Sequence, residues 1–218
     1  MDIKAFDQIP LFEKLNDVER EYLLKRFATR RYPKKAVIIN EGDDTSSFYI
    51  ILEGRVKIYL TDESGKQVIL NTQGAGEYFG EVALLDQGPR SASVITLQEC
   101  KFAVLNHQAF IEHISENPQL SLKIMQGLTQ RLRALSDNIR SLAFMDVYGR
   151  VARLLLELAS EQNGENIIDE RLTQSDIAAH VGASPKMVGR IMQELKKGDY
   201  IRKERQRLVI VKSLPAAW

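Results

Sequence analysis

Cysteine, histidine and long apolar runs are all scarce in this chain. The 218 residues include a single cysteine, Cys100, so an internal disulfide is impossible and the thiolates of an iron–sulfur cluster are missing. We expect Cys100 to be a small core residue. The three histidines do not stand at metal-ligand spacings, and we expect no metal site. No apolar run reaches the ~18 residues of a membrane span, and the N-terminus lacks a signal-peptide pattern, so we expect a cytoplasmic protein.

The chain also lacks an excess of either charge. Its net charge is +1, and it is 44% hydrophobic and 27% charged, which is an ordinary soluble composition. Any affinity for nucleic acid must therefore come from local clusters of basic residues. No Walker motif, Ser-His-Asp set or metal cluster is present, so we expect that the protein is not an enzyme. No histidine occupies a convincing ligand position for haem, which disfavours a haem sensor.

The most informative stretch is FGEVALLDQGPRSASV, residues 79–94. Gly80 and Glu81 precede a short apolar helical turn, while Arg90 and Ser91 follow a Gly-Pro turn, so both ends can face one cavity. Backbone N–H groups freed at Gly80 suit a phosphate, and Arg90 supplies a planar fork for its oxygens. Glu81 would repel a phosphate, so a ribose hydroxyl is its natural partner. The alternative is a buried Glu81–Arg90 ion pair that stiffens the loop of an effector-free protein.

This stretch resembles the phosphate-binding cassette of cyclic-nucleotide-binding domains. The resemblance implies that Gly80 and Glu81 hold the ribose 2′-hydroxyl, and that Arg90 and Ser91 hold the cyclic phosphate. It therefore implies cAMP or a related cyclic nucleotide as the effector.

The first half of the chain alternates between short strand-like runs and glycines. A capping box at Asn16–Glu19 predicts a helix that ends near Ala28. Repeated β-branched and aromatic runs then extend to about residue 105, and such spacing is typical of a barrel or jelly roll. The clearest of these runs are residues 37–39, 48–52, 56–60 and 68–70.

A long helix is predicted to begin at Asn117-Pro118. Its apolar residues recur in steps of three and four, which is the pattern of a coiled-coil seam: Met125, Leu128, Leu132, Leu135, Ile139 and Leu142. A β-roll alone cannot bury such a seam, so we expect it to pair with the same helix of a second chain in a two-fold homodimer. The alternative is packing within one subunit. The pattern breaks at residues 144–146, where we expect a hinge.

The last third of the chain predicts a helix-turn-helix followed by a β-hairpin wing. The capping box Thr173-Gln174-Ser175-Asp176 opens a short helix, residues 177–181, and a glycine turn follows. Ser184 caps a second helix with Pro185 at its first position. Lys186, Arg190 and Gln193 lie on its outer face. Residues 200–203 and 208–211 pair as the wing, and residues 161–166 are expected to be a polar loop.

Basic residues cluster in this region. Residues 184–212 contain nine lysines and arginines and three acids, a net charge of +6 in a nearly neutral protein, which favours phosphate binding. The region resembles the winged helix-turn-helix of Crp/Fnr transcription factors. We expect Arg190 to read a guanine and the wing to anchor phosphates. The predicted DNA-contacting residues are Thr173, Gln174, Ser184, Pro185, Lys186, Arg190, Lys203 and Arg205.

One departure from the family concerns the nucleotide base. In cAMP-responsive members a Thr-Ser pair on the dimer helix reaches the adenine, and the matching positions here are Leu135 and Ser136. Only Ser136 can hydrogen-bond a base, so the effector is cAMP or another nucleotide such as cyclic di-GMP. An effector-independent regulator is the remaining alternative.

The patterns together predict an α+β fold in three parts. Residues 1–116 form a cyclic-nucleotide-binding β-roll, residues 117–145 the dimerisation helix and hinge, and residues 146–218 the winged helix-turn-helix domain. The expected function is a homodimeric, ligand-gated transcription regulator. Its expected partners are palindromic double-stranded DNA and RNA polymerase.

Overall fold

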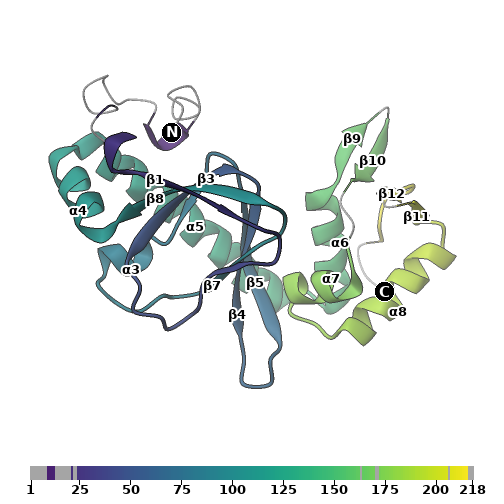
Figure 1. Cartoon of the computed structure of the whole chain (residues 1–218). Coiled ribbons are helices and arrows are strands. Elements are labelled where there is room, and N and C mark those ends of the chain that lie inside the picture. Colours follow the sequence, from purple (N-terminus) through teal and green to yellow (C-terminus); the bar gives the residue numbers. More distant parts are fainter. Residues whose placement is uncertain are drawn as a thin grey trace. The chain divides into compact units, whose positions relative to one another are not determined.

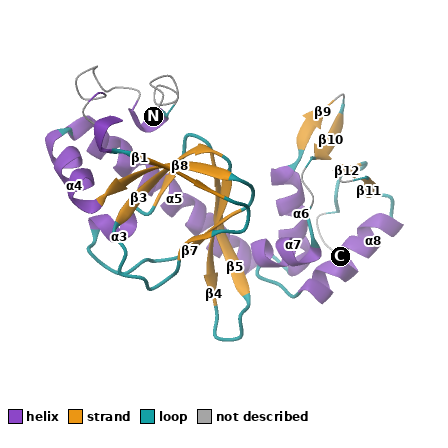
Figure 2. Ribbon diagram, in the orientation of Figure 1, coloured by secondary structure: helices purple, strands orange, loops and turns teal. Residues whose placement is uncertain are grey.

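The computed structural model describes residues 9–12, 21, 24–162, 164–169, 172–205 and 207–215. These residues form two compact units. The first contains the described residues up to Thr61 together with Ile69–Leu132, and the second contains Asp62–Val68 and the described residues from Arg133 onward. Both units mix helices and strands, which confirms the predicted α+β class (Figure 2). None of the described helices is both long and apolar enough to cross a membrane.

The first unit is built on two four-stranded sheets, which confirms the predicted β-roll. One sheet has the order β1 (Ala28–Tyr32), β8 (Cys100–Asn106), β3 (Ser47–Glu53), β6 (Tyr78–Phe79). The other has the order β2 (Val37–Ile39), β7 (Ser93–Thr96), β4 (Arg55–Thr61), β5 (Gln67–Gly74). Neighbouring strands run antiparallel, with Ala28 opposite Val104 in β1–β8 and Ile58 opposite Val94 in β4–β7.

Sequence periodicity found most of these strands but not β1. Residues 37–39, 48–52, 56–60 and 68–70 all lie within β2 to β5. β1 is the sequence ATRRY, which is largely exposed and has no apolar alternation, so its pairing with β8 alone makes it a strand. The predicted capping box at Asn16–Glu19 lies outside the described residues.

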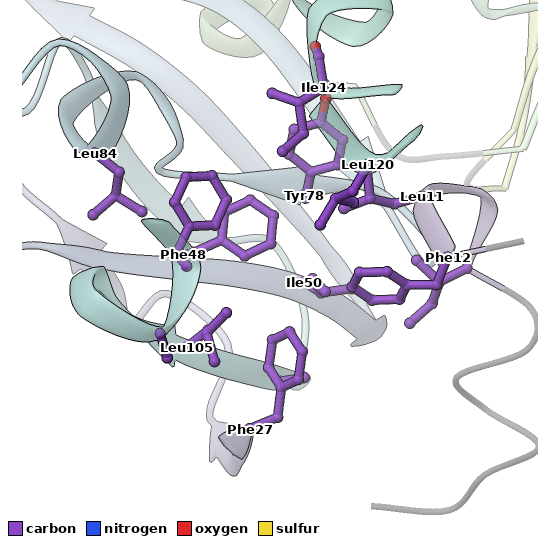
Figure 3. Packing of buried hydrophobic residues seen from close by; sticks show 14 residues of the cluster. Leu11, Phe12, Phe27, Phe48, Ile50, Tyr78, Leu84, Leu105, Leu120 and Ile124 are labelled. Carbon is purple, nitrogen blue, oxygen red and sulfur yellow. Dashed lines mark hydrogen bonds between the residues drawn. The ribbon is translucent and has the colours of Figure 1, made fainter. Parts of the chain in front are cut away.

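Aromatic and aliphatic side chains fill the interior of the roll. Phe48 lies 4.8 Å from Phe110 and 5.5 Å from Tyr78 between ring centroids, and it is 1% exposed (Figure 3). A second cluster packs Phe79 against Phe102 and includes Cys100, whose 1% exposure confirms its predicted place in the core.

Helical segments accompany the sheets (Figure 1). Those with bounds in the described residues include η1 (Pro10–Phe12), α3 (Val82–Leu85), α4 (His107–Glu116) and the long α5 (Pro118–Phe144). α5 begins where the sequence predicts, because the Asn117 side chain accepts the backbone N–H of Leu120 at 3.0 Å and the first helical residue is a proline. α5 ends at Phe144, as the break in its apolar pattern predicts.

The second unit combines three helices with a four-stranded sheet. Its helices are α6 (Val147–Leu158), α7 (Gln174–Val181) and α8 (Pro185–Lys197). The sheet has the order β11 (Ile201–Glu204), β12 (Arg207–Ile210), β10 (Glu165–Ile168), β9 (Ser160–Gln162). The expected loop over residues 161–166 is therefore wrong, because Glu161 and Gln162 lie in β9, and Glu165 and Asn166 lie in β10, of a β-hairpin. The polar composition hid the hairpin, whose strand β10 is held by the wing strand β12.

A glycine lets α5 approach the β-roll closely. The hydroxyl of Tyr78, at the end of β6, lies 3.5 Å from the carbonyl oxygen of Ile124, and Figure 3 shows its ring beside that residue. A Cβ added at Gly127 would meet the Tyr78 hydroxyl oxygen at 2.1 Å and the ring carbon Cζ at 3.2 Å. Only glycine therefore fits this helical position while Tyr78 keeps its place.

We predict that the effect of Gly127→Ala on the free energy of unfolding depends on Tyr78. At an open helical site this change stabilises by about 1 kcal/mol. Here the overlap with Tyr78 should instead lower the free energy of unfolding by about 1–3 kcal/mol, as overpacking does. In a Tyr78→Phe background the hydroxyl is gone, and Gly127→Ala should recover most of that loss. Urea denaturation of the wild type, the two single variants and the double variant measures this, and a gain in stability in the wild-type background would contradict the close approach.

Candidate functional site

The backbone at Gly80 brings the two ends of the 79–94 stretch together. Gly80 has a φ of +85°, and an added Cβ would lie 2.8 Å from both the Arg90 Nη1 and the Ser47 carbonyl oxygen. A side chain here is therefore excluded by both backbone conformation and space. The structure brings Gly80, Glu81 and Arg90 into one place, as the sequence predicts.

Arg90 is fixed by neutral acceptors and is 3% exposed. It donates to the carbonyl oxygens of Gly80 and Ser47, both at 2.8 Å, and to the Thr45 hydroxyl at 3.1 Å. A guanidinium has five N–H groups, so each terminal nitrogen keeps a second N–H beyond these three bonds. Burial lowers the pKa of Arg90 from its ordinary value, yet a guanidinium stays charged in proteins. The site thus holds a positioned cation with two N–H groups to offer an anion.

The loop that carries Arg90 is tied to the turn before β3. The backbone N–H of Gly42 donates to the Arg90 carbonyl at 2.8 Å, and the Arg90 N–H donates to the Asp43 carbonyl at 2.9 Å. The Ser93 hydroxyl accepts the N–H of Glu41 at 3.0 Å. Ser91 is exposed beside these contacts, and its predicted role as a phosphate ligand stays a prediction.

Glu81 forms its ion pair with α5 and not within the loop. Its carboxylate is 1% exposed and accepts a hydrogen bond from Arg131, whose Nη2 also donates to the Tyr78 carbonyl oxygen at 2.6 Å. The Arg131 guanidinium lies 4.7 Å from the centroid of the Tyr78 ring. The alternative of a Glu81–Arg90 ion pair is therefore wrong, because Arg131 takes that place.

Burial raises the pKa of the Tyr78 hydroxyl. The nearby Glu81 carboxylate also raises this pKa, whereas the Arg131 cation lowers it. Tyr78 is therefore a neutral neighbour of this ion pair. Sequence reasoning missed Arg131 because it lies between seam positions of an amphipathic helix, where a charged residue usually faces solvent.

Arg131 engages only one of the two oxygens of the Glu81 carboxylate. Its Oε2 is buried and has no hydrogen-bond partner among the residues that the structure describes. A buried carboxylate oxygen without a donor is costly, so it requires an explanation. A ligand hydroxyl would satisfy it, and the Arg90 N–H groups would suit an adjacent phosphate. These residues therefore fit a ribose phosphate.

Leu135 and Ser136 lie in α5, four and five residues beyond Arg131, and both are exposed. They belong to the second unit. Their predicted contact with the nucleotide base stays a prediction.

Local capping produces the helix-turn-helix. The Thr173 hydroxyl accepts the N–H of Asp176 at 3.1 Å, and the Asp176 carboxylate accepts the N–H of Thr173 at 3.0 Å. α7 therefore starts at Gln174, earlier than the predicted residue 177. Gly182 has a φ of +64° and turns the chain. The Ser184 hydroxyl then accepts the N–H of Met187 at 3.3 Å, which caps α8 as predicted.

Helices α7 and α8 pack closely through a glycine. A Cβ at Gly189 would lie 2.9 Å from the side-chain oxygen of Gln174. Val188 and Leu195 are fully buried on the inner face of α8, whereas Lys186 and Arg190 are exposed on the outer face. The predicted inner and outer faces of α8 are thus confirmed.

The basic cluster divides into paired and unpaired cations. Ion pairs at 2.7–3.2 Å neutralise part of it: Lys197 with Glu194, Arg202 with Glu204, and Arg207 with Asp169. Within the described ranges, no ion pair engages the four cations predicted to contact DNA, Lys186, Arg190, Lys203 and Arg205, and all four are exposed. The other predicted DNA contacts, Thr173, Gln174, Ser184 and Pro185, are exposed as well.

Arg150 of α6 ties the hinge to the helix-turn-helix, and sequence reasoning missed it. Its side chain donates to the Met145 carbonyl at 2.8 Å and to the Val181 carbonyl at 2.9 Å. Asp146 caps α6 by accepting the N–H of Gly149 at 2.7 Å. The end of α7 is therefore linked to the residues that join α5 to α6.

Both parts of the chain match known family models. Residues 29–117 match the cyclic nucleotide-binding domain, and residues 149–216 match the Crp-like helix-turn-helix domain.

Relatives match almost the whole chain. It is 30% identical over 217 residues to the cAMP-activated global transcriptional regulator CRP of Haemophilus influenzae, which covers 96% of this chain and 97% of that protein. It is 32% identical over 192 residues to the CRP-like cAMP-activated global transcriptional regulator of Mycobacterium tuberculosis, covering 86% of each. The structure of CLP from Xanthomonas campestris, a c-di-GMP responsive global regulator, has a TM-score of 0.79 at 23% identity, over 90% of this chain and 100% of that one.

A cyclic-nucleotide-binding β-roll joined to a helix-turn-helix defines a DNA-binding transcription regulator and not an enzyme. The chain belongs to the Crp/Fnr family, as the sequence resemblance indicates.

Proposed function

We propose that this regulator is gated by a cyclic nucleotide, most simply cAMP, held between Glu81 and Arg90. The observation that carries the proposal is the buried Oε2 of Glu81, which lacks a donor within the described structure. A ribose hydroxyl donates to that oxygen, and the cyclic phosphate accepts from the two remaining N–H groups of Arg90. Relatives that are 30% and 32% identical are named as cAMP-activated, which supports cAMP.

A second nucleotide is favoured by one observation. Leu135 stands where cAMP-responsive members of the family have a hydroxyl residue, and a missing base contact costs about 1–3 kcal/mol when the group is buried. Cyclic di-GMP shares the ribose and phosphate chemistry and is therefore the alternative effector.

The effector prediction concerns Arg90. Arg90→Lys keeps the charge but loses the planar fork, and Arg90→Leu loses both, so affinity should fall about tenfold and at least a hundredfold respectively. Glu81→Gln should also weaken binding, because an amide is a poorer acceptor for the ribose hydroxyl. Calorimetric titration of the full chain with cAMP, cGMP and cyclic di-GMP measures each affinity.

Arg31→Leu serves as the control, because Arg31 is an arginine of the same unit whose side chain is 65% exposed, and it should leave the affinity unchanged. Thermal unfolding checks that each variant is folded. A wild-type protein that binds none of the three nucleotides, or folded Arg90 variants that bind as the wild type does, would reject the proposed site.

We also propose that α5 pairs with its copy in a homodimer. Its apolar residues are exposed along most of the predicted seam: Met125 52%, Leu132 64%, Leu135 40%, Ile139 67% and Leu142 50%. Leu128 differs, because it packs against the core of its own β-roll. Exposed apolar residues at heptad spacing are the surface that a second helix buries.

The dimer prediction uses two substitutions that add the same charge. Leu132→Asp should weaken association by about a hundredfold or more, because it buries an unpaired carboxylate in the seam. Gln130→Asp, two residues away and off that face, should not. Sedimentation of both variants across a concentration series tests this. Equal association of both variants would put the interface on another surface.

The proposed gating runs through Glu81 and Arg131. An effector that hydrogen-bonds Glu81 acts on the carboxylate that holds α5, so it biases the arrangement of that helix. The size of this bias is set by how much more tightly the effector binds one arrangement of α5 than the other. Such coupling is typically about 1–3 kcal/mol. We propose that the hinge at Phe144–Asp146 carries this bias to the helix-turn-helix, which acts on palindromic DNA and RNA polymerase in the cytoplasm.

The DNA prediction separates base reading from phosphate anchoring. Arg190→Ala should weaken DNA binding by about 1–3 kcal/mol and relax the sequence preference at one base pair per half-site. The reason is that the planar guanidinium of Arg190 fits the edge of a guanine. Lys203→Ala or Arg205→Ala should weaken binding to all sequences alike. Each should also lower the slope of log affinity against log salt concentration by about one. Binding to a selected palindrome and to scrambled DNA across a salt series measures both effects.

Lys197→Ala is the control in this assay, because Lys197 already pairs with Glu194 and should change the salt slope less. If Arg190→Ala lowers the affinity for both duplexes equally, Arg190 is a phosphate contact only.

A further inference from the structure

The outer face of α8 carries one large apolar side chain. Met187 is 45% exposed, and it is not part of the apolar core that Val188 and Ile191 join. It stands one residue after Lys186 and three before Arg190, so the three side chains share the outward side of the first turns. This exposed apolar residue can therefore contact an apolar feature of whatever binds the outer face of α8.

The position of Met187 restricts that partner. It is the third residue of α8, whose start is set by the Ser184 cap, and the N-terminal residues of a recognition helix are those that reach base edges. A thioether cannot bond a phosphate or a hydrogen-bonding base edge strongly. The 5-methyl group of thymine is the apolar feature that the major groove presents.

We propose that Met187 packs on a thymine methyl next to the guanine read by Arg190, and so specifies one further base pair in each half-site. This inference rests on the proposed DNA-reading face of α8. Met187 is suited to the role because methionine is flexible and apolar, and it can settle over a methyl group without a rigid fit. Lys186 and Arg190 on either side supply the polar contacts that orient the helix.

The test removes the methyl group from the DNA. Full-length protein selects duplexes from a random library, with and without cAMP, and each thymine of the selected duplex is then replaced in turn by deoxyuridine. Wild-type protein should lose about fourfold in affinity per half-site at one position beside the guanine, the effect of burying about one methyl group. Replacing that thymine in both half-sites should cost about fifteenfold.

Two variants link the methyl effect to the side chain. Met187→Ala should bind the thymine and uracil duplexes equally well, whereas Met187→Leu should keep most of the difference. Leu156→Ala is the matched control, because Leu156 is an exposed apolar residue of α6, and it should leave the thymine-to-uracil ratio unchanged. Since Met187 is exposed, thermal unfolding should be unaltered by its substitution.

Three outcomes would overturn the inference. In the first, uracil replaces every thymine without loss in the wild type. In the second, the loss persists fully in Met187→Ala. In the third, the selected duplex has no thymine beside the guanine. Each leaves the proposed DNA-binding function standing. A protein that selects no duplex under either condition would overturn both.

Discussion

The ion pair between the buried Glu81 carboxylate and Arg131 is the contact on which the proposed effector site depends. A carboxylate that is 1% exposed has lost its hydration, and only a charge partner with good geometry compensates for that loss. Arg131 brings the charge from α5 and is itself held by the carbonyl oxygen and the ring of Tyr78. The loop of the proposed effector site and the long helix are therefore joined through one carboxylate.

The same unit holds the Arg90 guanidinium in a fixed orientation at the proposed anion site. Arg90 is oriented by main-chain oxygens of Gly80 and Ser47, and such oxygens cannot rotate away as side chains do. At the proposed site, a side chain oriented by main-chain contacts lowers the ordering cost of binding an anion. Gly80 makes this possible, since any Cβ there would press on Arg90 and on the Ser47 oxygen.

In the described part of the second unit, ion pairs neutralise some of the basic residues and leave others unpaired. Lys197, Arg202 and Arg207 are neutralised by acids of their own unit, so the formal cluster of basic residues overstates what DNA meets. The unpaired cations at the start of α8 and in the wing are the ones that we propose to contact DNA. Helix α8 with its local cap holds Lys186 and Arg190, and the β11–β12 hairpin carries Lys203 and Arg205, so a nearly neutral chain presents a basic surface in this unit.

The sequence by itself determined the elements whose bonds close within a few residues. The Thr173–Asp176 capping box and the Ser184 cap needed no distant partner, and the cassette residues Gly80 and Arg90 followed from their order. Tertiary structure decided the rest. Strand β1 and the β9–β10 hairpin exist because a distant strand pairs with them. Arg131 reaches Glu81 across fifty residues. Such contacts leave no periodicity in the sequence, because their partners become neighbours only when the chain folds.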